Sequence, residues 1–167
     1  MNRIKISSIF LILILALSLL PVMGLIAAAE GSYTIPHATF DLYVQEDGNL
    51  RVKETLHYSF DGTFNGVYRD IPIQTGERIE NINVSTEGAY STYVVTNNSD
   101  MTSLKIYLYS DSAKTTPISN KDVVVTIEYD FINAIKIYND VAGLQFKVWG
   151  EYWNVDVGGI TTNVHLK

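Results

Sequence analysis

Apolar and polar side chains alternate with a period of two along most of the chain after Glu30. In the ranges 37–44 and 50–60 the even-numbered positions are apolar, apart from Glu54, which interrupts the second run. Between the two runs, residues 46–49 read Glu-Asp-Gly-Asn, the composition of a tight turn in which glycine accepts positive φ at little cost. This pattern predicts a β-hairpin with one apolar face.

Further β-type runs follow at short, turn-separated intervals. They lie at residues 82–84, 90–96, 104–108, 122–131, 142–148 and 160–166. About eight strands at this spacing are typical of a sandwich or barrel. Since one face of each run is apolar, we predict an all-β domain, an immunoglobulin-like two-sheet antiparallel β-sandwich. No stretch after Ala29 keeps a helical period for three turns, which argues against a helical or α/β domain.

The first 29 residues have the pattern of a targeting segment. Residues 1–5 are basic, residues 6–29 carry no charge, and Pro21 and Gly24 precede a run of three alanines that ends at Ala29. This order predicts an apolar signal helix that is cleaved before Glu30. An uncleaved signal-anchor is the alternative, because the uncharged run could span a bilayer of about 30 Å. We therefore expect a signal peptide or anchor at 1–29 and one extracytoplasmic domain at 30–167.

Charge and cysteine content narrow the chemistry. The chain holds 12 Lys and Arg against 18 Asp and Glu, a net charge of −6. Both Arg3 and Lys5 lie in the leader, whereas every acidic residue lies at Glu30 or later, so cleavage leaves 10 basic and 18 acidic residues and a net charge of −8. That charge disfavours nucleic acid as a partner. The absence of cysteine excludes disulfides, thiolate metal sites and a cysteine nucleophile.

Two segments depart from a simple strand pattern. Residues 64–73 read FNGVYRDIPI, and residues 129–155 end in the aromatic run VWGEYWNV. Their order and spacing resemble the N-terminal exported domain of the predicted-membrane-protein family called domain of unknown function 2207. That family's pattern resembles G-x-Y-R-x-I-P, followed far downstream by an aromatic Gly-acidic-x-Trp segment. The resemblance covers most of 39–166 and carries no catalytic signature.

The resemblance implies an extracytoplasmic β-sandwich that is tethered by a membrane helix after the domain. This sequence stops at Lys167 without a second apolar run. We therefore expect either a fragment or shortened product of a longer anchored protein, or a chain whose leader alone attaches it to the membrane.

Arg69, between Tyr68 and Asp70, is the first candidate binding residue. Its guanidinium could hold the carboxylate of a peptide or a sugar acid. Alternatively it pairs with a carboxylate such as Asp70 or Glu151 and fixes a long loop to the sandwich. We favour the structural role, because buried ion pairs more often fix geometry than bind ligands.

Trp149, Tyr152 and Trp153 form the densest aromatic group, with Glu151 between them. Exposed rings could stack on a glycan or rest at a membrane interface. Buried rings would close one end of the sandwich, which is the interpretation we favour. Glu151 could accept hydrogen bonds from an indole N–H or from the candidate arginine.

The remaining polar candidates predict little chemistry. His37, His57 and His165 fall on polar faces of separate strands, so we predict no metal site and no cofactor. The sequons at Asn83 and Asn97 are compatible either with glycosylation of an exported chain or with ordinary polar surface.

Three functions compete. The first is a non-enzymatic interaction or structural domain of a cell-envelope protein, which contacts the membrane and possible envelope proteins or glycans. The second is a glycan- or peptide-binding module that uses Trp149 and Trp153. The third is a carboxylate-pair hydrolase, which we place last because the sequence lacks H-E-x-x-H, G-x-S-x-G and a glycine-rich phosphate loop.

Overall fold

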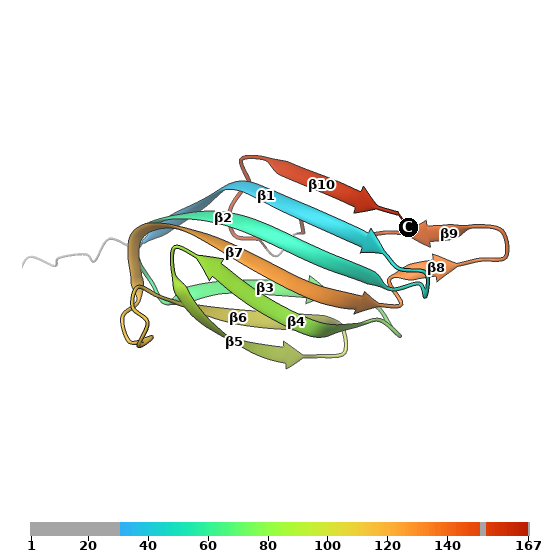
Figure 1. Ribbon diagram of the computed structural model, residues 1–167, viewed down its shortest axis with the longest axis horizontal. Coiled ribbons are helices and arrows are strands. Elements are labelled where there is room, and N and C mark those ends of the chain that lie inside the picture. The colour runs from blue at the N-terminus through green and yellow to red at the C-terminus, as the bar shows by residue number, and fades with distance from the viewer. Residues whose placement is uncertain (1–30, 151–152, 167) are drawn as a thin grey trace, which may run out of the picture.

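Two β-sheets lie face to face in the computed structural model, which describes residues 31–150 and 153–166 (Figure 1). The predicted leader, together with Glu151 and Tyr152, lies outside the described residues. The larger sheet has five strands in the order β10-β1-β2-β7-β4, and the smaller one has three in the order β3-β6-β5. Strands β8 and β9 form a separate hairpin that extends from one end of the sandwich (Figure 1).

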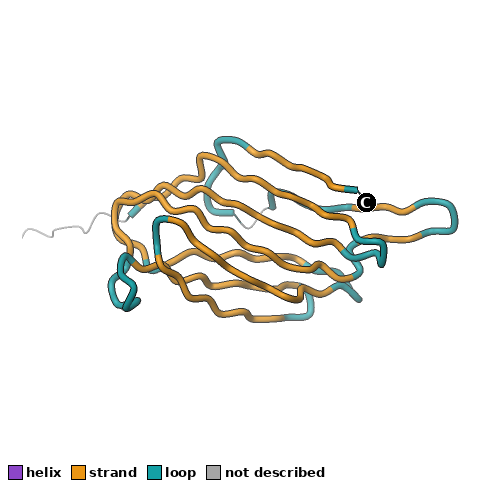
Figure 2. Tube along the Cα trace, in the orientation of Figure 1, coloured by secondary structure: helices purple, strands orange, loops and turns teal. Residues whose placement is uncertain are grey.

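The described residues contain ten strands. Their bounds are β1 Ser32–Val44, β2 Leu50–Phe64, β3 Gly66–Pro72, β4 Arg78–Glu87, β5 Tyr90–Asn97, β6 Met101–Tyr109, β7 Ile118–Ile132, β8 Ile135–Ile137, β9 Ala142–Leu144 and β10 Ile160–His165. Strands and loops account for all of the chain that Figure 2 colours by structure. The prediction of an all-β domain is confirmed.

The predicted hairpin is β1 and β2. These strands pair antiparallel from Val44↔Leu50 outward, and Gly48 in their turn has φ of 81°. The Asp47 carboxylate accepts a hydrogen bond from the Asn49 backbone N–H at 3.1 Å, which fixes the turn. Alternation then follows from the pleat, since successive side chains of a strand point to opposite faces.

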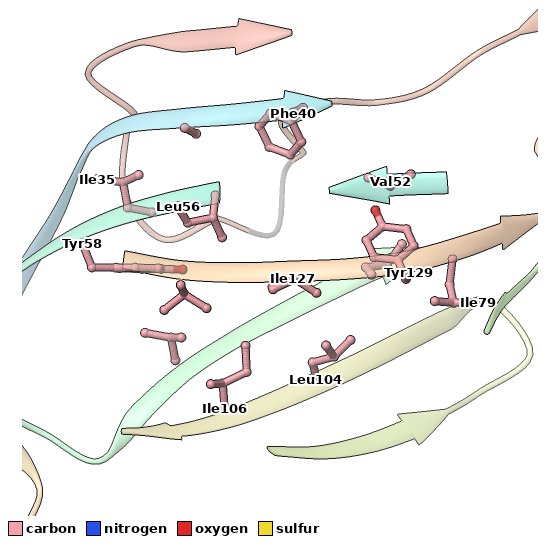
Figure 3. Packing of buried hydrophobic residues seen from close by; sticks show 14 of the residues in the cluster. Ile35, Phe40, Val52, Leu56, Tyr58, Ile79, Leu104, Ile106, Ile127 and Tyr129 are labelled. Carbon is pink, nitrogen blue, oxygen red and sulfur yellow. The ribbon is translucent and has the colours of Figure 1, made fainter. Parts of the chain in front are cut away.

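The core lies between the two sheets. Leu56 of β2 and Ile127 of β7 are fully buried, and so are Leu104 and Ile106 of β6 in the opposite sheet. Figure 3 shows these side chains pointing into the space between the layers. Burying a Leu or Ile side chain stabilises the fold by about 1.5–3 kcal/mol, so the alternating apolar positions supply the main force that holds the sheets together.

The five-stranded sheet is wider than its partner, and the connection between β9 and β10 packs against the core as well. The apolar residues of this connection that pack against it are Phe146, Val148, Trp149, Trp153, Val155 and Val157. No helix among the described residues is long and apolar enough to cross a membrane.

Three details of the strands differ from the sequence-based expectation. The described chain has ten strands rather than about eight, and residues 66–72 form strand β3 instead of a long loop. The strand expected at 142–148 ends at Leu144. Beyond it, Phe146 and Val148 are half-buried against the core.

The sheets are also not wholly antiparallel, because β10 pairs parallel with β1. A parallel neighbour requires a crossover connection rather than a tight turn. The chain crosses from β7 to β10 through the segment that includes β8 and β9, and the alternation within β10 could not reveal its direction.

Candidate functional site

An ion pair links the two sheets inside the core. Glu54 lies on β2 between Phe40 of β1 and Ile127 of β7, and it is fully buried. Arg69 reaches it from β3 in the opposite sheet and is 6% exposed. Because β3 alternates, Arg69 points inward with Val67 and Ile71, which are also buried.

The pair is bidentate and has a third member. Arg69 Nε donates to Glu54 Oε2 at 2.7 Å, and Arg69 Nη2 donates to Glu54 Oε1 at 2.9 Å. The Tyr129 hydroxyl, from β7, donates to Glu54 Oε1 at 2.7 Å. Arg69 Nη1 donates to the backbone carbonyl of Asp70. A fork-like guanidinium suits this arrangement, which a lysine could not reproduce.

The electrostatics keep this cluster in one protonation state. Burial acts to lower the pKa of Arg69, but the negative charge and hydrogen bonds of Glu54 outweigh it, so that the pKa is raised. Burial raises the pKa of Tyr129 well above its usual value, and the charge of Glu54 adds to that effect. Arg69 therefore stays charged and Tyr129 stays neutral, which suits a structural bond between the sheets.

The two tryptophans cover this cluster. The Trp153 ring lies 5.2 Å from the Arg69 guanidinium carbon, and Trp149 stacks on Trp153 with centroids 4.1 Å apart and planes 6° apart. Both tryptophans are half-buried. Trp153 Nε1 is buried and has no hydrogen-bond partner in the part of the chain that the structure describes. With Trp149 on one side and Arg69 over its ring, Trp153 offers little open surface for stacking on a sugar.

The predicted site residues thus separate into different places. Arg69 and Trp153 meet at the buried cluster, whereas Tyr68 points to the opposite face of β3 and is 62% exposed. The carboxylate that pairs with Arg69 is Glu54 rather than Asp70, which contributes only its backbone carbonyl. Glu151 and Tyr152 lie outside the described residues.

Sequence reasoning missed Glu54 and Tyr129 as members of the cluster. The signal was present, because Glu54 is a charged residue at an apolar position of its strand. Arg69 occupies a similar position between Val67 and Ile71. Two opposite charges at core positions of different strands predict a buried pair, since a lone buried charge is too costly.

The outer face of the five-stranded sheet carries paired charges. Arg51 contacts Asp130 at 3.0 Å and Glu128 at 3.5 Å. Asp41 accepts hydrogen bonds from Asn163 at 2.9 Å and from His165 at 3.1 Å. These contacts, chiefly the Asn163 bond, lower the pKa of Asp41.

The three histidines all lie on this outer face. The rings of His37 and His57, paired across β1 and β2, are 6.1 Å apart, and His165 stacks on Tyr43 at 4.3 Å. Among residues 31–150 and 153–166, no group of three or more acidic or histidine side chains is placed to hold a metal ion.

The outer face of the three-stranded sheet differs from this charged surface. Tyr68 of β3 pairs with Lys105 of β6, and Tyr107 and Tyr109 follow on the same side of β6. The Lys105 ammonium lies 5.5 Å from the Tyr68 ring centroid and 4.8 Å from that of Tyr107. We call these four residues the tyrosine face.

Fold and cluster together define a class: a two-layer β domain whose sheets are joined by a buried ion pair under an aromatic cover. The sequence matches the family described as "Predicted membrane protein (DUF2207) N-terminal domain" over residues 34–167. The chain therefore belongs to this family of predicted membrane proteins with unknown function, as the sequence motifs predicted.

Other comparisons add little about chemistry. No curated protein matches the sequence. Among solved structures, a mutant of the M1 zinc metallopeptidase from Deinococcus radiodurans is 15% identical with a TM-score of 0.40, covering 59% of this chain and 20% of the peptidase. Yeast LTA4 hydrolase in complex with bestatin is 10% identical with a TM-score of 0.35, covering 59% of this chain and 14% of the hydrolase. The chain thus spans a fifth or less of those proteins, and their activities are not carried over.

Proposed function

We propose that residues 30–167 form an extracytoplasmic, non-enzymatic interaction domain, an immunoglobulin-like sandwich, of a membrane-associated envelope protein. Family membership supports the membrane association. The basic head, apolar centre and small-residue end of the first 29 residues support export.

The hydrogen bonds within the buried cluster support the non-enzymatic part of this proposal. Catalytic carboxylates need a reacting group within reach and a path for substrate. Glu54, the deepest carboxylate of the described chain, is instead occupied by Arg69 and Tyr129, and Trp153 lies over the arginine. A carboxylate whose oxygens are paired in this way stabilises the fold, so we expect the outer surfaces to bind partners.

Cysteine labelling tests the location sharply, because the sequence has no cysteine of its own. Thr75→Cys lies in an exposed turn, whereas Val125→Cys lies at a fully buried position of β7. We expect a membrane-impermeant maleimide to label the Thr75→Cys protein on intact cells. The Val125→Cys protein should react only after unfolding, which controls for misfolded chains.

Labelling of Thr75→Cys only after cell lysis would place the domain inside the cell and overturn the proposal. The non-enzymatic part has a separate test: any turnover of a glycoside or peptide substrate that Glu54→Gln abolishes, in a variant that remains folded, would contradict it.

A further inference from the structure

The tyrosine face combines flat aromatic surface with a hollow. Tyr107 and Tyr109 are two residues apart on β6, which separates their backbones by about 7 Å along the strand. This spacing is of the same order as the length of one sugar unit. Gly66 pairs with Tyr107, and a Cβ on Gly66 would lie 2.0 Å from the backbone oxygen of Ile106, so no side chain can fill that position.

The resulting hollow measures about 650 Å³. Its lining residues are Thr63, Phe64, Asn65, Gly66, Tyr68, Lys105, Tyr107 and Tyr109. Aromatic rings, hydroxyls, a side-chain amide and one ammonium group therefore converge on a single concave surface. Sites for small molecules likewise combine aromatic surface with placed polar groups in a concave surface.

Lys105 contacts tyrosine rings, whereas several other cations of the described chain contact carboxylates. Arg51, Arg78 and Lys136 each contact a carboxylate. None of the ion pairs found among the described residues includes Lys105, whose ammonium lies between two tyrosine rings instead. Hydrogen bonds to Tyr107 and then to Tyr68 raise the pKa of Lys105. Like any exposed lysine, it is charged at neutral pH.

Tyr68 is well exposed on the outer face. It is 62% exposed, because the alternation of β3 turns it away from the core that Arg69 and Ile71 enter. A large aromatic side chain in water gains nothing for folding, and tyrosine supplies rigid contact area with a polar tip when a partner covers it. Within the fold Tyr68 contacts Lys105, and most of the residue remains open to a partner.

We propose that the tyrosine face binds a glycan that carries carboxylate groups. The apolar sides of the sugar rings stack on the tyrosine rings of this face. The Lys105 ammonium, which without ligand lies 5.5 Å and 4.8 Å from the Tyr68 and Tyr107 ring centroids, receives a sugar carboxylate as a compact point charge. The rest of the domain is acidic, since residues 30–167 hold 10 basic and 18 acidic residues, so it repels such a ligand elsewhere and favours this surface.

Nucleic acid, which also stacks on aromatic rings, is a poorer fit. A nucleic-acid strand carries a phosphate at every step, and its binding depends on several basic side chains along the groove. The tyrosine face offers one lysine within an acidic domain. A sugar acid needs only one charge contact for each carboxylate.

The inference rests on the proposed function, because it uses an interaction surface of a non-enzymatic domain. It is tested by calorimetric titration of the full-length protein, purified in mild detergent, with trigalacturonic acid, its methyl ester and a hyaluronan hexasaccharide. We expect at least one of the two acids to bind. The methyl ester, which keeps the rings but loses the charge, should bind about tenfold more weakly than its parent acid.

Variants separate the two parts of the site. Tyr68→Ala and Lys105→Gln should each weaken binding of the acid by about tenfold. Tyr138→Ala and Lys121→Gln are matched controls, since both residues are exposed and lie away from this sheet face. They should retain the wild-type affinity, and all four variants should keep the wild-type melting temperature.

Three results would overturn the proposal: no binding of either acid at millimolar concentration, equal affinity of the Tyr68 and Lys105 variants to wild type, or a change of oligomeric state in those variants. The last result would make the face a contact between copies of the chain. If no acid binds but Thr75→Cys is labelled on intact cells, only the glycan inference is refuted. If Thr75→Cys is labelled only after lysis, the proposed function is refuted, whatever the titration shows.

Discussion

Replacing Glu54 should cost more stability than replacing any surface carboxylate. Glu54→Leu leaves the Arg69 guanidinium buried at 6% exposure without a counter-charge. Removal of one partner of a buried pair costs about 3–5 kcal/mol. Loss of the acceptor for the Tyr129 hydroxyl adds about 1–3 kcal/mol. Since a domain of this size has a total stability of about 5–15 kcal/mol, the variant should be close to unfolding.

The double variant Glu54→Leu/Arg69→Met gives the decisive comparison. It removes both charges and takes these side-chain partners from only two neutral groups, the Tyr129 hydroxyl and the Asp70 carbonyl. Because neither of them is a buried charge, the double variant should be more stable than either single variant. Urea unfolding, followed by the fluorescence of Trp149 and Trp153, measures all three free energies and gives a double-mutant cycle. We expect a coupling of about 3 kcal/mol.

Glu128→Gln is the matched control. Glu128 lies on the outer face of the same sheet, 3.5 Å from Arg51, with its side chain 33% exposed. A surface ion pair of this kind is worth about 0–1 kcal/mol. Two results would contradict this account: Glu54→Leu lowers the free energy of unfolding no more than Glu128→Gln does, or the effects of the two core substitutions on that free energy simply add. In either case the ion pair does not stabilise the contact between the sheets.

Two further predictions concern pH. Burial raises the pKa of Tyr58, with a smaller contribution from Tyr33. The neutral Tyr58 hydroxyl therefore contributes fully to the free energy of unfolding below the pKa of about 10 that it has in the unfolded chain, and this contribution is lost as pH rises above that pKa. Tyr58→Phe should therefore reduce the loss of melting temperature between pH 9 and about 11, and an unchanged loss would contradict the assignment. The pKa of Asp41 is lowered by Asn163 and then by His165, so its contribution is present above the unfolded value of about 3.9 and is lost as pH falls through the folded one. Asp41→Asn should reduce the loss of unfolding free energy at acid pH, measured by urea unfolding, by less than about 1 kcal/mol, because its contacts lie on the solvent-facing side of the sheet and its partner His165 is 45% exposed. A loss as steep as that of wild type would refute this account.

The sequence predicted the elements that depend on local alternation. The β1–β2 hairpin followed from the apolar even positions and from the Asp-Gly pair in its turn, and the all-β class followed from the same period. Local pattern could not identify β3 as a strand, because Arg69 stands where the alternation requires an apolar residue. The position of Arg69 in the core becomes clear only when the fold places Glu54 opposite it.

The candidate site shows the same limit. The sequence indicates Arg69 as a candidate residue of its segment. The partners expected for it were Asp70, which is adjacent in sequence, and Glu151, which lies in the aromatic run. The true partner is 15 residues away on another sheet. The tyrosine face could not be predicted either, because Tyr68 and Tyr107 come together only through the pairing of β3 with β6.

The parallel pairing of β10 with β1 has a kinetic consequence. Asp41 and Asn163, which meet across these strands, are 122 residues apart. β1 must therefore wait for β10, which is synthesised much later, and closing so long a loop carries an entropic penalty that slows folding. Until β10 has been synthesised, one edge of β1 lacks its partner strand, and a growing chain in that condition is a natural client for chaperones that hold polypeptides open.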